Sequence, residues 1–261
     1  EIQCCLVGSE MCIRDSIAIY PAYSRMWQGD MIMAAVDAAQ KIGYDGDLNN
    51  LTAYEKRITD GIYDRLVMFS GDDARKESAY VARFAQELGA DVEPVAMPRV
   101  WIDENASTRA NELLAEASIL PGDRFAVIVA GAASPKRIWD PENYLPSIEW
   151  LHSQGIKIVF CGAGADALIF EKVSEFSAVP VASLINRTTL PELSAILARA
   201  ELYIGTETGT LQMAVACDVP SVCIMGGGHF SRFYPHKEDE RFRMVYHPMD
   251  CFRCNWNCCH E

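Results

Sequence analysis

From residue 123 onward, short apolar runs alternate with segments patterned as helices. The runs at 125–129, 156–160 and 219–225 are almost entirely apolar. Strands of this kind are buried on both faces, so they belong to a parallel sheet with helices on each side. Ligands of such sheets bind at the carboxyl ends of the strands. The pattern therefore predicts an α/β fold whose binding site lies in the loops that follow the strands.

The stretch 200–220 holds the most informative of these loops. An apolar strand pattern is followed by the cluster Thr-Glu-Thr-Gly-Thr and then by the apolar face of a helix. Thr206 or Thr208 is placed to cap that helix, and its first amides suit a phosphate. Glu207, just before the helix, suits sugar hydroxyls or a base edge, and Gln212 lies about one turn into the helix. The alternative is an ordinary capped turn.

Two more loops at the same predicted edge carry cations. Lys136 and Arg137 follow the first of these strands, where two positive charges can neutralise a diphosphate. The sequence GGGHFSRF places His229 and Arg232 after consecutive glycines, which serve where the backbone bends sharply or approaches another group. The alternatives are a solvated basic pair and a structural histidine.

The sequence CGAGADA, at 161–167, matches the weak form G-x-G-x-x-A of a dinucleotide fingerprint. That fingerprint also expects an acid about 20 residues later, which contacts the ribose. The region around Ala182 offers none, and no P-loop sequence occurs in the chain. We therefore expect no nicotinamide cofactor and no P-loop chemistry.

The chain has 261 residues, a formal net charge of −13 and ten cysteines. The acidity argues against nucleic acid as a partner. No apolar run reaches the length of a membrane-spanning helix. Cysteines in an α/β chain of this size indicate reduced thiols and a cytoplasmic protein. Four of them lie near the end of the chain in the sequence CFRCNWNCCH, together with a histidine: Cys251, Cys254, Cys258, Cys259 and His260. Their irregular spacing favours clustered thiols over a metal site.

The beginning of the chain follows a different pattern. Residues 1–16 show no helical or strand periodicity and do not lead into the strand pattern after them. We expect them to be a non-native leader. Apolar spacing then predicts helices over 28–42, 75–88 and 105–119.

The order of these motifs resembles glycosyltransferase family 9, the family of the bacterial heptosyltransferases. The resemblance covers about 123–235 and rests on AASPKRIWDPENY, VFCGAGAD, TTLPELSAILARAELYIGTETGTLQMA and PSVCIMG. The family signature D-[ST]-G-x-x-H-x-A reads ETGTLQMA at 207–214. Glu207 thus replaces an aspartate and Gln212 a histidine.

The resemblance implies a GT-B architecture of two Rossmann-like domains, here with an incomplete N-terminal one. After the leader at 1–16, it implies a partial acceptor-side domain over 17–120. A nucleotide-sugar-binding domain that lacks its end follows over 121–261. The implied reaction is inverting, metal-independent sugar transfer to lipopolysaccharide or another cell-envelope saccharide. No cofactor is implied, and the acceptor is a saccharide or lipid-linked saccharide reached from the cytoplasmic face of the inner membrane.

Carried over by position, Ser134 and Lys136 or Arg137 hold the diphosphate and Asp166 lies near the ribose. The start of the helix at Thr208 and Gly209 contacts phosphates or the donor sugar.

The family's catalytic aspartate lies in an S-x-G-D-type motif near the chain start, and we do not find this motif. The chain is therefore interpreted as a fragment whose transfer activity is in question and whose catalytic residues are unknown. Asp30 is a substitute acid, or simply a helix cap. The alternative functions are a non-catalytic nucleotide-sugar-binding remnant and a nucleotide-sugar epimerase of the same architecture.

Overall fold

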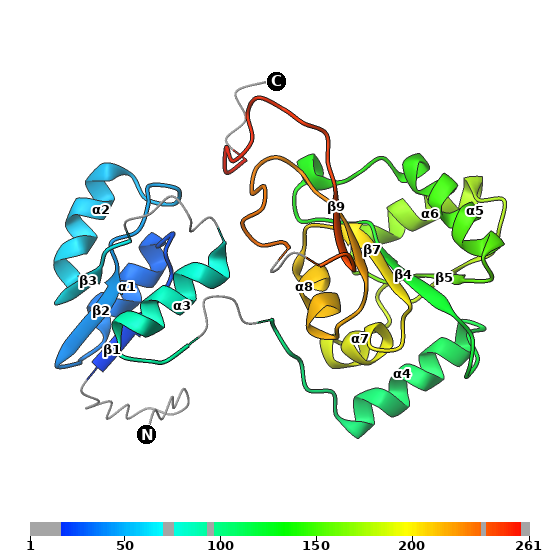
Figure 1. Cartoon of the computed structure of the whole chain (residues 1–261), viewed down its shortest axis with the longest axis horizontal. Helices are drawn as coiled ribbons and strands as arrows, with labels where there is room; N and C mark the ends of the chain where they lie inside the picture. The colour runs from blue at the N-terminus through cyan, green and yellow to red at the C-terminus, as the bar shows by residue number, and fades with distance from the viewer. Residues whose placement is uncertain (1–16, 70–75, 93–96, 236–238, 257–261) are drawn as a thin grey trace. The chain divides into compact units, whose positions relative to one another are not determined.

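The computed structural model describes residues 17–69, 76–92, 97–235 and 239–256 (Figure 1). The chain divides into two compact units, Glu1–Ala96 and Met97–Glu261. The expected leader at 1–16 lies outside the described residues. The expected domain boundary after residue 120 stays a prediction, and in the structure the segment 97–120 packs with the second unit. Within the described ranges, no helix is long and apolar enough to cross a membrane.

The first unit contains a three-stranded parallel sheet in the order β1-β2-β3. Its small core joins the sheet to one helix through Ile42, Tyr44, Val67 and Phe84, with aromatic side chains packed around them. The strands are β1 (Ile17–Tyr20), β2 (Gln40–Tyr44) and β3 (Arg65–Val67), and the helices are α1 (Trp27–Ala35), α2 (Ala53–Thr59) and α3 (Glu77–Glu87).

The helix expected over 28–42 is wrong in its second half. Helix α1 ends at Ala35, and β2 begins at Gln40. Strand β2 lies between β1 and β3, with Ile42 opposite both Ile19 and Arg65. Pairing on two sides therefore overrides a local apolar spacing that also suits a helix.

The second unit is built on a six-stranded parallel sheet in the order β6-β5-β4-β7-β8-β9. The predicted alternation of strands and helices is confirmed, and the last strand is an addition that the sequence pattern did not indicate. The strands are β4 (Phe125–Val129), β5 (Lys157–Phe160), β6 (Val181–Ser183), β7 (Leu202–Thr206), β8 (Ser221–Ile224) and β9 (Phe242–Val245). The helices are α4 (Glu104–Glu116), α5 (Leu145–Ser153), α6 (Asp166–Phe176), α7 (Leu190–Leu197) and α8 (Gly209–Ala216).

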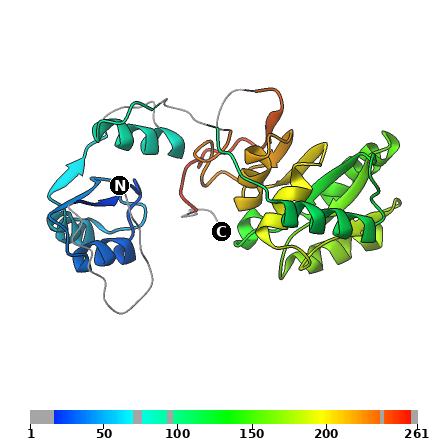
Figure 2. The same ribbon diagram turned by 90° about the horizontal axis from the view of Figure 1, so that it is seen from below.

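Helices cover both faces of this sheet (Figures 1 and 2). Successive side chains of β4 alternate between two core clusters, with Val127 and Val129 in one and Ala126 and Ile128 in the other. The first cluster includes residues of α4, α7 and α8, and the second includes residues of α5 and α6. This is the packing that the apolar runs predict, because the side chains on both faces of the central strand β4 are buried.

Candidate functional site

The loops singled out by the sequence leave the sheet of the second unit at one edge. Strands β4, β5, β7 and β8 are linked by parallel pairings, so their carboxyl ends point the same way. The loops after β4 and β8 carry the predicted cations, and the turn after β7 carries Glu207. The expected convergence of these loops is therefore a property of the fold.

Glu207 is the most unusual residue at this edge. Its side chain is only 5% exposed, and neither carboxylate oxygen has a hydrogen-bond partner within the described structure. Burial raises the pKa of Glu207 to about 7, although the nearby Arg137 guanidinium lowers it. A buried carboxyl group without a partner is costly, and a bound ligand that supplies hydroxyl groups would remove this cost.

Arg137 lies beside Glu207. Its Nη1 donates a hydrogen bond to the backbone carbonyl of Glu207 at 3.1 Å, and its guanidinium lies 5.9 Å from the ring centre of Trp256. Lys136 is exposed and Ser134 is half-buried in the same loop, next to the helical turn Pro135–Arg137. The structure therefore brings one predicted cation, Arg137, to the backbone of Glu207 and leaves the other, Lys136, at the surface.

Helix α8 begins without a side-chain cap. Thr208 is its N-cap residue, but the Thr208 hydroxyl bonds with Thr210 Oγ1 at 2.8 Å instead of capping the helix. The Thr206 hydroxyl donates to the Gly131 carbonyl at 2.7 Å. The predicted capping hydrogen bond is therefore wrong. The first amides of α8, next to the exposed Gly209, carry no such cap and suit an anion.

Gln212 links α8 to the loop after β8, because its Nε2 donates to the Phe233 carbonyl at 3.1 Å. Arg232 in that loop lies with its guanidinium 5.1 Å from the Phe233 ring centre.

Asp166 supports two loops of this edge. Its Oδ2 accepts a hydrogen bond from the Ala163 amide at 3.0 Å, and its carboxylate fills the space beside Gly131 and Gly162. A Cβ atom at either glycine would overlap with the carboxylate, which explains why both positions are glycine. The expected contact with a ribose stays a prediction, and sequence reasoning missed this supporting role.

His229 lies against the end of the described chain. Its ring contacts Asn255 and Trp256, two residues of the sequence CFRCNW. Cys251 and Cys254 in this sequence are half-buried free thiols. The described residues contain no group of three or more His, Cys, Asp or Glu side chains suited to a metal ion. The other members of the cluster, Cys258, Cys259 and His260, lie outside the described residues.

Asp30, in the first unit, is completely buried. It accepts a hydrogen bond from Tyr63 Oη at 2.6 Å and lies 3.9 Å from Arg25 Nε. Met26, and not Asp30, is the N-cap residue of α1. The interpretation of Asp30 as a helix cap is therefore wrong.

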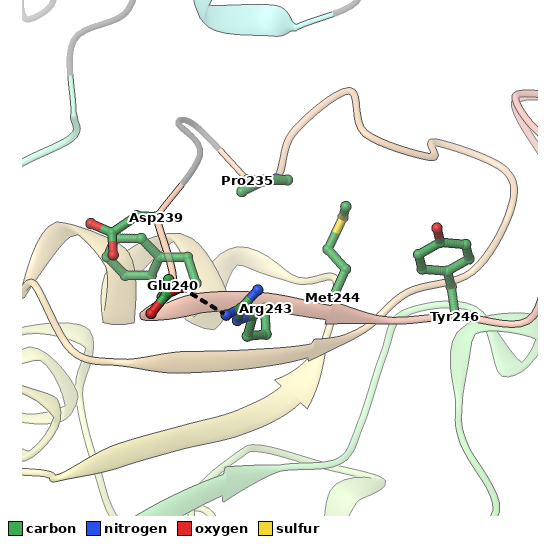
Figure 3. A pocket seen from close by; sticks show the side chains of 7 residues that line it. Pro235, Asp239, Glu240, Arg243, Met244 and Tyr246 are labelled. Atoms are coloured by element: carbon green, nitrogen blue, oxygen red, sulfur yellow. Dashed lines mark ion pairs between the residues drawn. The ribbon is translucent and has the colours of Figure 1, made fainter.

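A separate hollow lies along edge strand β9 (Figure 3). Its lining contains none of the predicted site residues and includes an ion pair between Arg243 and Glu240 at 3.8 Å. We therefore place the candidate site at the carboxyl edge of the sheet and not in this hollow.

Known proteins with similar sequences transfer heptose. Lipopolysaccharide heptosyltransferase 3 of Escherichia coli is 28% identical over 109 residues, which cover 40% of this chain and 32% of that protein. Lipooligosaccharide heptosyltransferase 2 of Campylobacter jejuni is 26% identical over 134 residues, which cover 50% of this chain and 41% of that protein. The chain thus spans less than half the length of these curated relatives.

Solved structures of glycosyltransferases share the fold. The family 9 glycosyltransferase of Veillonella parvula superposes with a TM-score of 0.69 at 16% identity, over 88% of this chain and 62% of that one. The E. coli ADP-heptose lipopolysaccharide heptosyltransferase II superposes with a TM-score of 0.64 at 16% identity, over 92% and 73%. These matches confirm the predicted GT-B type of α/β fold.

A family model gives the assignment by sequence. The model of glycosyltransferase family 9 (heptosyltransferase) matches residues 31–256, which is most of the chain. The match includes the loops after β4, β5, β7 and β8 that form the candidate site. The chain therefore belongs to glycosyltransferase family 9, the heptosyltransferase family.

Proposed function

We propose that the carboxyl edge of the six-stranded sheet binds a nucleotide-sugar donor for glycosyl transfer. The observation that carries this proposal is the buried Glu207 carboxyl group, which has no hydrogen-bond partner in the described structure. Sugar hydroxyls are the natural partners of such a group. The Arg137 guanidinium and the uncapped start of α8 lie next to it and suit a diphosphate.

The donor is proposed to be an ADP-sugar. The E. coli heptosyltransferase WaaC, which shares the fold at a TM-score of 0.56 and 19% identity, has been solved with ADP. The same enzyme has been solved with ADP-2-deoxy-2-fluoro heptose. ADP-heptose is therefore the first ligand to test. Glu207 and Gln212 replace the aspartate and histidine of the family signature, so the sugar is the part of the donor where we expect a difference.

The proposed reaction is inverting, metal-independent transfer of the sugar to lipopolysaccharide or another cell-envelope saccharide. The cations Arg137 and Lys136 would stabilise the departing diphosphate, and the Ser134 hydroxyl in the same loop would donate a hydrogen bond to it. A base must also take the proton of the acceptor hydroxyl, within hydrogen-bonding reach. Asp30 is fully buried against Tyr63, so its carboxylate would have to move before it could meet an acceptor. We assign no catalytic base.

The proposal is tested by thermal-shift and calorimetric titration with ADP-, UDP- and GDP-sugars, because a ligand bound by the native state raises stability. We expect the ADP-sugar to bind, and we expect Glu207→Gln to weaken this binding at least tenfold. Glu175→Gln, an exposed acid on α6, is the matched control. If the folded protein binds no nucleotide sugar, or if both variants bind as the wild type does, the proposal is wrong.

A product assay then separates the three functions that share this fold. Release of nucleoside diphosphate only when a saccharide acceptor is present indicates a transferase. Conversion of the sugar with no acceptor indicates an epimerase. Binding without either reaction indicates a non-catalytic nucleotide-sugar-binding protein.

A further inference from the structure

The two sequences that the proposed donor site does not explain, GGGHFSRF and CFRCNW, form one substructure. The Arg253 amide donates to the Gly227 carbonyl at 2.7 Å, and the Asn255 amide donates to the Gly228 carbonyl at 3.0 Å. The Trp256 ring lies directly against Gly226 and Gly228, where a Cβ atom would clash with the indole. Glycine is therefore required at these positions because an aromatic ring lies on the backbone.

His229 holds this tryptophan through a hydrogen bond with only one possible direction. Trp256 Nε1 lies 3.2 Å from His229 Nδ1, and His229 Nε2 lies 2.8 Å from Asn255 Oδ1. An indole N–H can only donate, so His229 Nδ1 must accept. The ring is then neutral with its proton on Nε2, which donates to Asn255 Oδ1. The arrangement is consistent only with an uncharged histidine.

Trp256 also meets the proposed donor site. Its ring lies 5.9 Å from the guanidinium of Arg137, and Arg137 Nη1 reaches the backbone carbonyl of Glu207 at 3.1 Å. The face of an indole attracts a guanidinium and limits where it can lie. An unbroken series of contacts therefore runs from His229 through Trp256 and Arg137 to the turn that begins α8.

We propose that Trp256 and His229 are positioning residues, which hold the Arg137 guanidinium where it meets the diphosphate of the donor. This inference rests on the proposed function of the sheet edge. Neither residue needs to touch the donor. Trp256 acts through the orientation of Arg137, and His229 acts through the orientation of Trp256.

The neutral histidine makes this support dependent on pH. Protonation would place an N–H on His229 Nδ1, opposite the N–H of Trp256, and two donors cannot bond. Burial lowers the pKa of His229 below its ordinary value of 6.5. The hydrogen bond to Asn255 raises it, whereas the cations Arg232 and Arg137 lower it further. The support is therefore complete at neutral pH and is lost as the pH falls below 6.5.

The contact itself is tested by NMR, without any ligand. The chain has five tryptophans, and the indole N–H signal that disappears in Trp256→Phe belongs to Trp256. We expect this signal to shift on acidification with a midpoint below pH 6.5, and to stay constant in His229→Gln, which cannot titrate. A Trp256 signal that does not respond to pH in the wild type would overturn the proposed hydrogen bond.

The positioning role is tested by calorimetric titration with ADP and ADP-heptose. Trp256→Leu should weaken binding roughly fivefold, which is the size of a cation–π contact. Trp256→Phe keeps an aromatic face and should retain most of the affinity. Trp150→Leu, which removes an exposed tryptophan from α5, is the control and should bind as the wild type does. Arg137→Gln should lose most of the affinity.

The pH profile supplies a readout that a purely structural role would not change. Wild-type affinity should fall below pH 6.5 more steeply than that of His229→Gln. Both proteins keep Glu207, so their difference reports His229 alone. Wild-type binding that is lost in Arg137→Gln but retained in Trp256→Leu would overturn the positioning role and leave the donor site intact. A folded wild type that binds neither ADP nor ADP-heptose would overturn both.

Discussion

Asp30 in the first unit and Glu207 in the second are withdrawn from solvent to nearly the same degree, at 0% and 5% exposed. Asp30 Oδ1 accepts a hydrogen bond from the Tyr63 hydroxyl, and Asp30 Oδ2, which has no hydrogen bond within the described structure, lies 3.9 Å from Arg25 Nε. The oxygens of Glu207 have no such partner among the described residues. Burial of a carboxylate is tolerated when the protein supplies a counter-charge and hydrogen bonds. Asp30 thus has one hydrogen bond and a counter-charge from its own unit, whereas neither oxygen of Glu207 has a hydrogen bond, which leaves both of them for a ligand.

Two helix starts show the same contrast. At the start of α2, Thr52 and Glu55 form a complete capping box. At the start of α8, Thr208 makes no capping bond. Helices of the second unit differ in this respect, because Thr189 and Glu192 form a capping box at the start of α7, whereas α5 and α6 have no side-chain cap.

The largest expected effect comes from removing the acid of the first unit. Asp30→Ala leaves the Arg25 guanidinium buried with Asp60 as its remaining charged partner. Loss of one member of a buried ion pair costs about 3–5 kcal/mol, so the urea midpoint of the first unit should fall sharply. Asp37→Ala, at an exposed acid that follows α1, should have little effect. An Asp30→Ala protein of normal stability that has lost transfer activity would instead make Asp30 a catalytic acid.

The unpartnered acid of the second unit should make stability depend on pH. The folded-state pKa of Glu207, about 7, exceeds its ordinary value of 4.5. The associated stability is fully present below pH 4.5 and is lost as the pH rises through 7, by roughly 3 kcal/mol in total. Urea unfolding from about pH 4 to 8 should therefore show this decline for the wild type and a flatter profile for Glu207→Gln. Equal slopes for the two proteins would mean that Glu207 is satisfied after all.

Asp166 lies between Asp30 and Glu207 in how well its carboxylate is partnered. It accepts a hydrogen bond from a backbone amide, and it occupies the space that the missing side chains of Gly131 and Gly162 leave free. Gly131→Ala would push a methyl group into the Asp166 carboxylate, and overpacking of this kind costs about 1–3 kcal/mol. Thermal unfolding should show this loss. Gly209→Ala, where a Cβ atom meets nothing within 4 Å, should show none. A Gly131→Ala protein as stable as the wild type would mean that Asp166 moves freely.

The smallest expected effect is the loss of stability when the N-cap threonine of α2 or of α8 is replaced. Thr52→Ala removes a formed cap and should destabilise the first unit by about 1 kcal/mol. Thr208→Ala removes no capping bond and should cost clearly less when measured by the same urea titration. Comparable losses at the two positions would show that α8 is capped in solution, which would weaken the case for an anion at its first amides.

Much of the second unit could be predicted from the sequence, because its signals are local. The run FAVIV corresponds to β4 without error, and the strand, turn and helix expected over 200–220 are β7, the turn at Glu207, and α8. Parallel strands then bring their following loops to one edge whatever the details of packing. The candidate site of Arg137 and Glu207 follows from that rule.

The errors occurred where local patterns are ambiguous. The predicted helix continues to residue 42 on its apolar spacing, yet pairing with β1 and β3 makes Gln40–Tyr44 a strand. The Thr208 hydroxyl is placed to cap α8, yet a neighbouring hydroxyl on Thr210 binds it instead. In both cases a contact in the folded protein competes with the local pattern: strand pairing competes with the helix, and the Thr210 hydroxyl competes with the helix amides. A sequence pattern does not show which of the two is made.

By itself, the sequence determined the parallel sheet and the edge at which its loops gather, and it indicated that the backbone at the consecutive glycines 226–228 either bends sharply or approaches another group. Only the tertiary structure decided between these alternatives and identified the approaching group. Trp256 lies on these glycines, and His229 and Asn255 hold it beside Arg137. The reason is physical: strand and helix patterns come from neighbours along the chain, whereas the contact of Trp256 with Gly226 joins segments that lie far apart in the sequence.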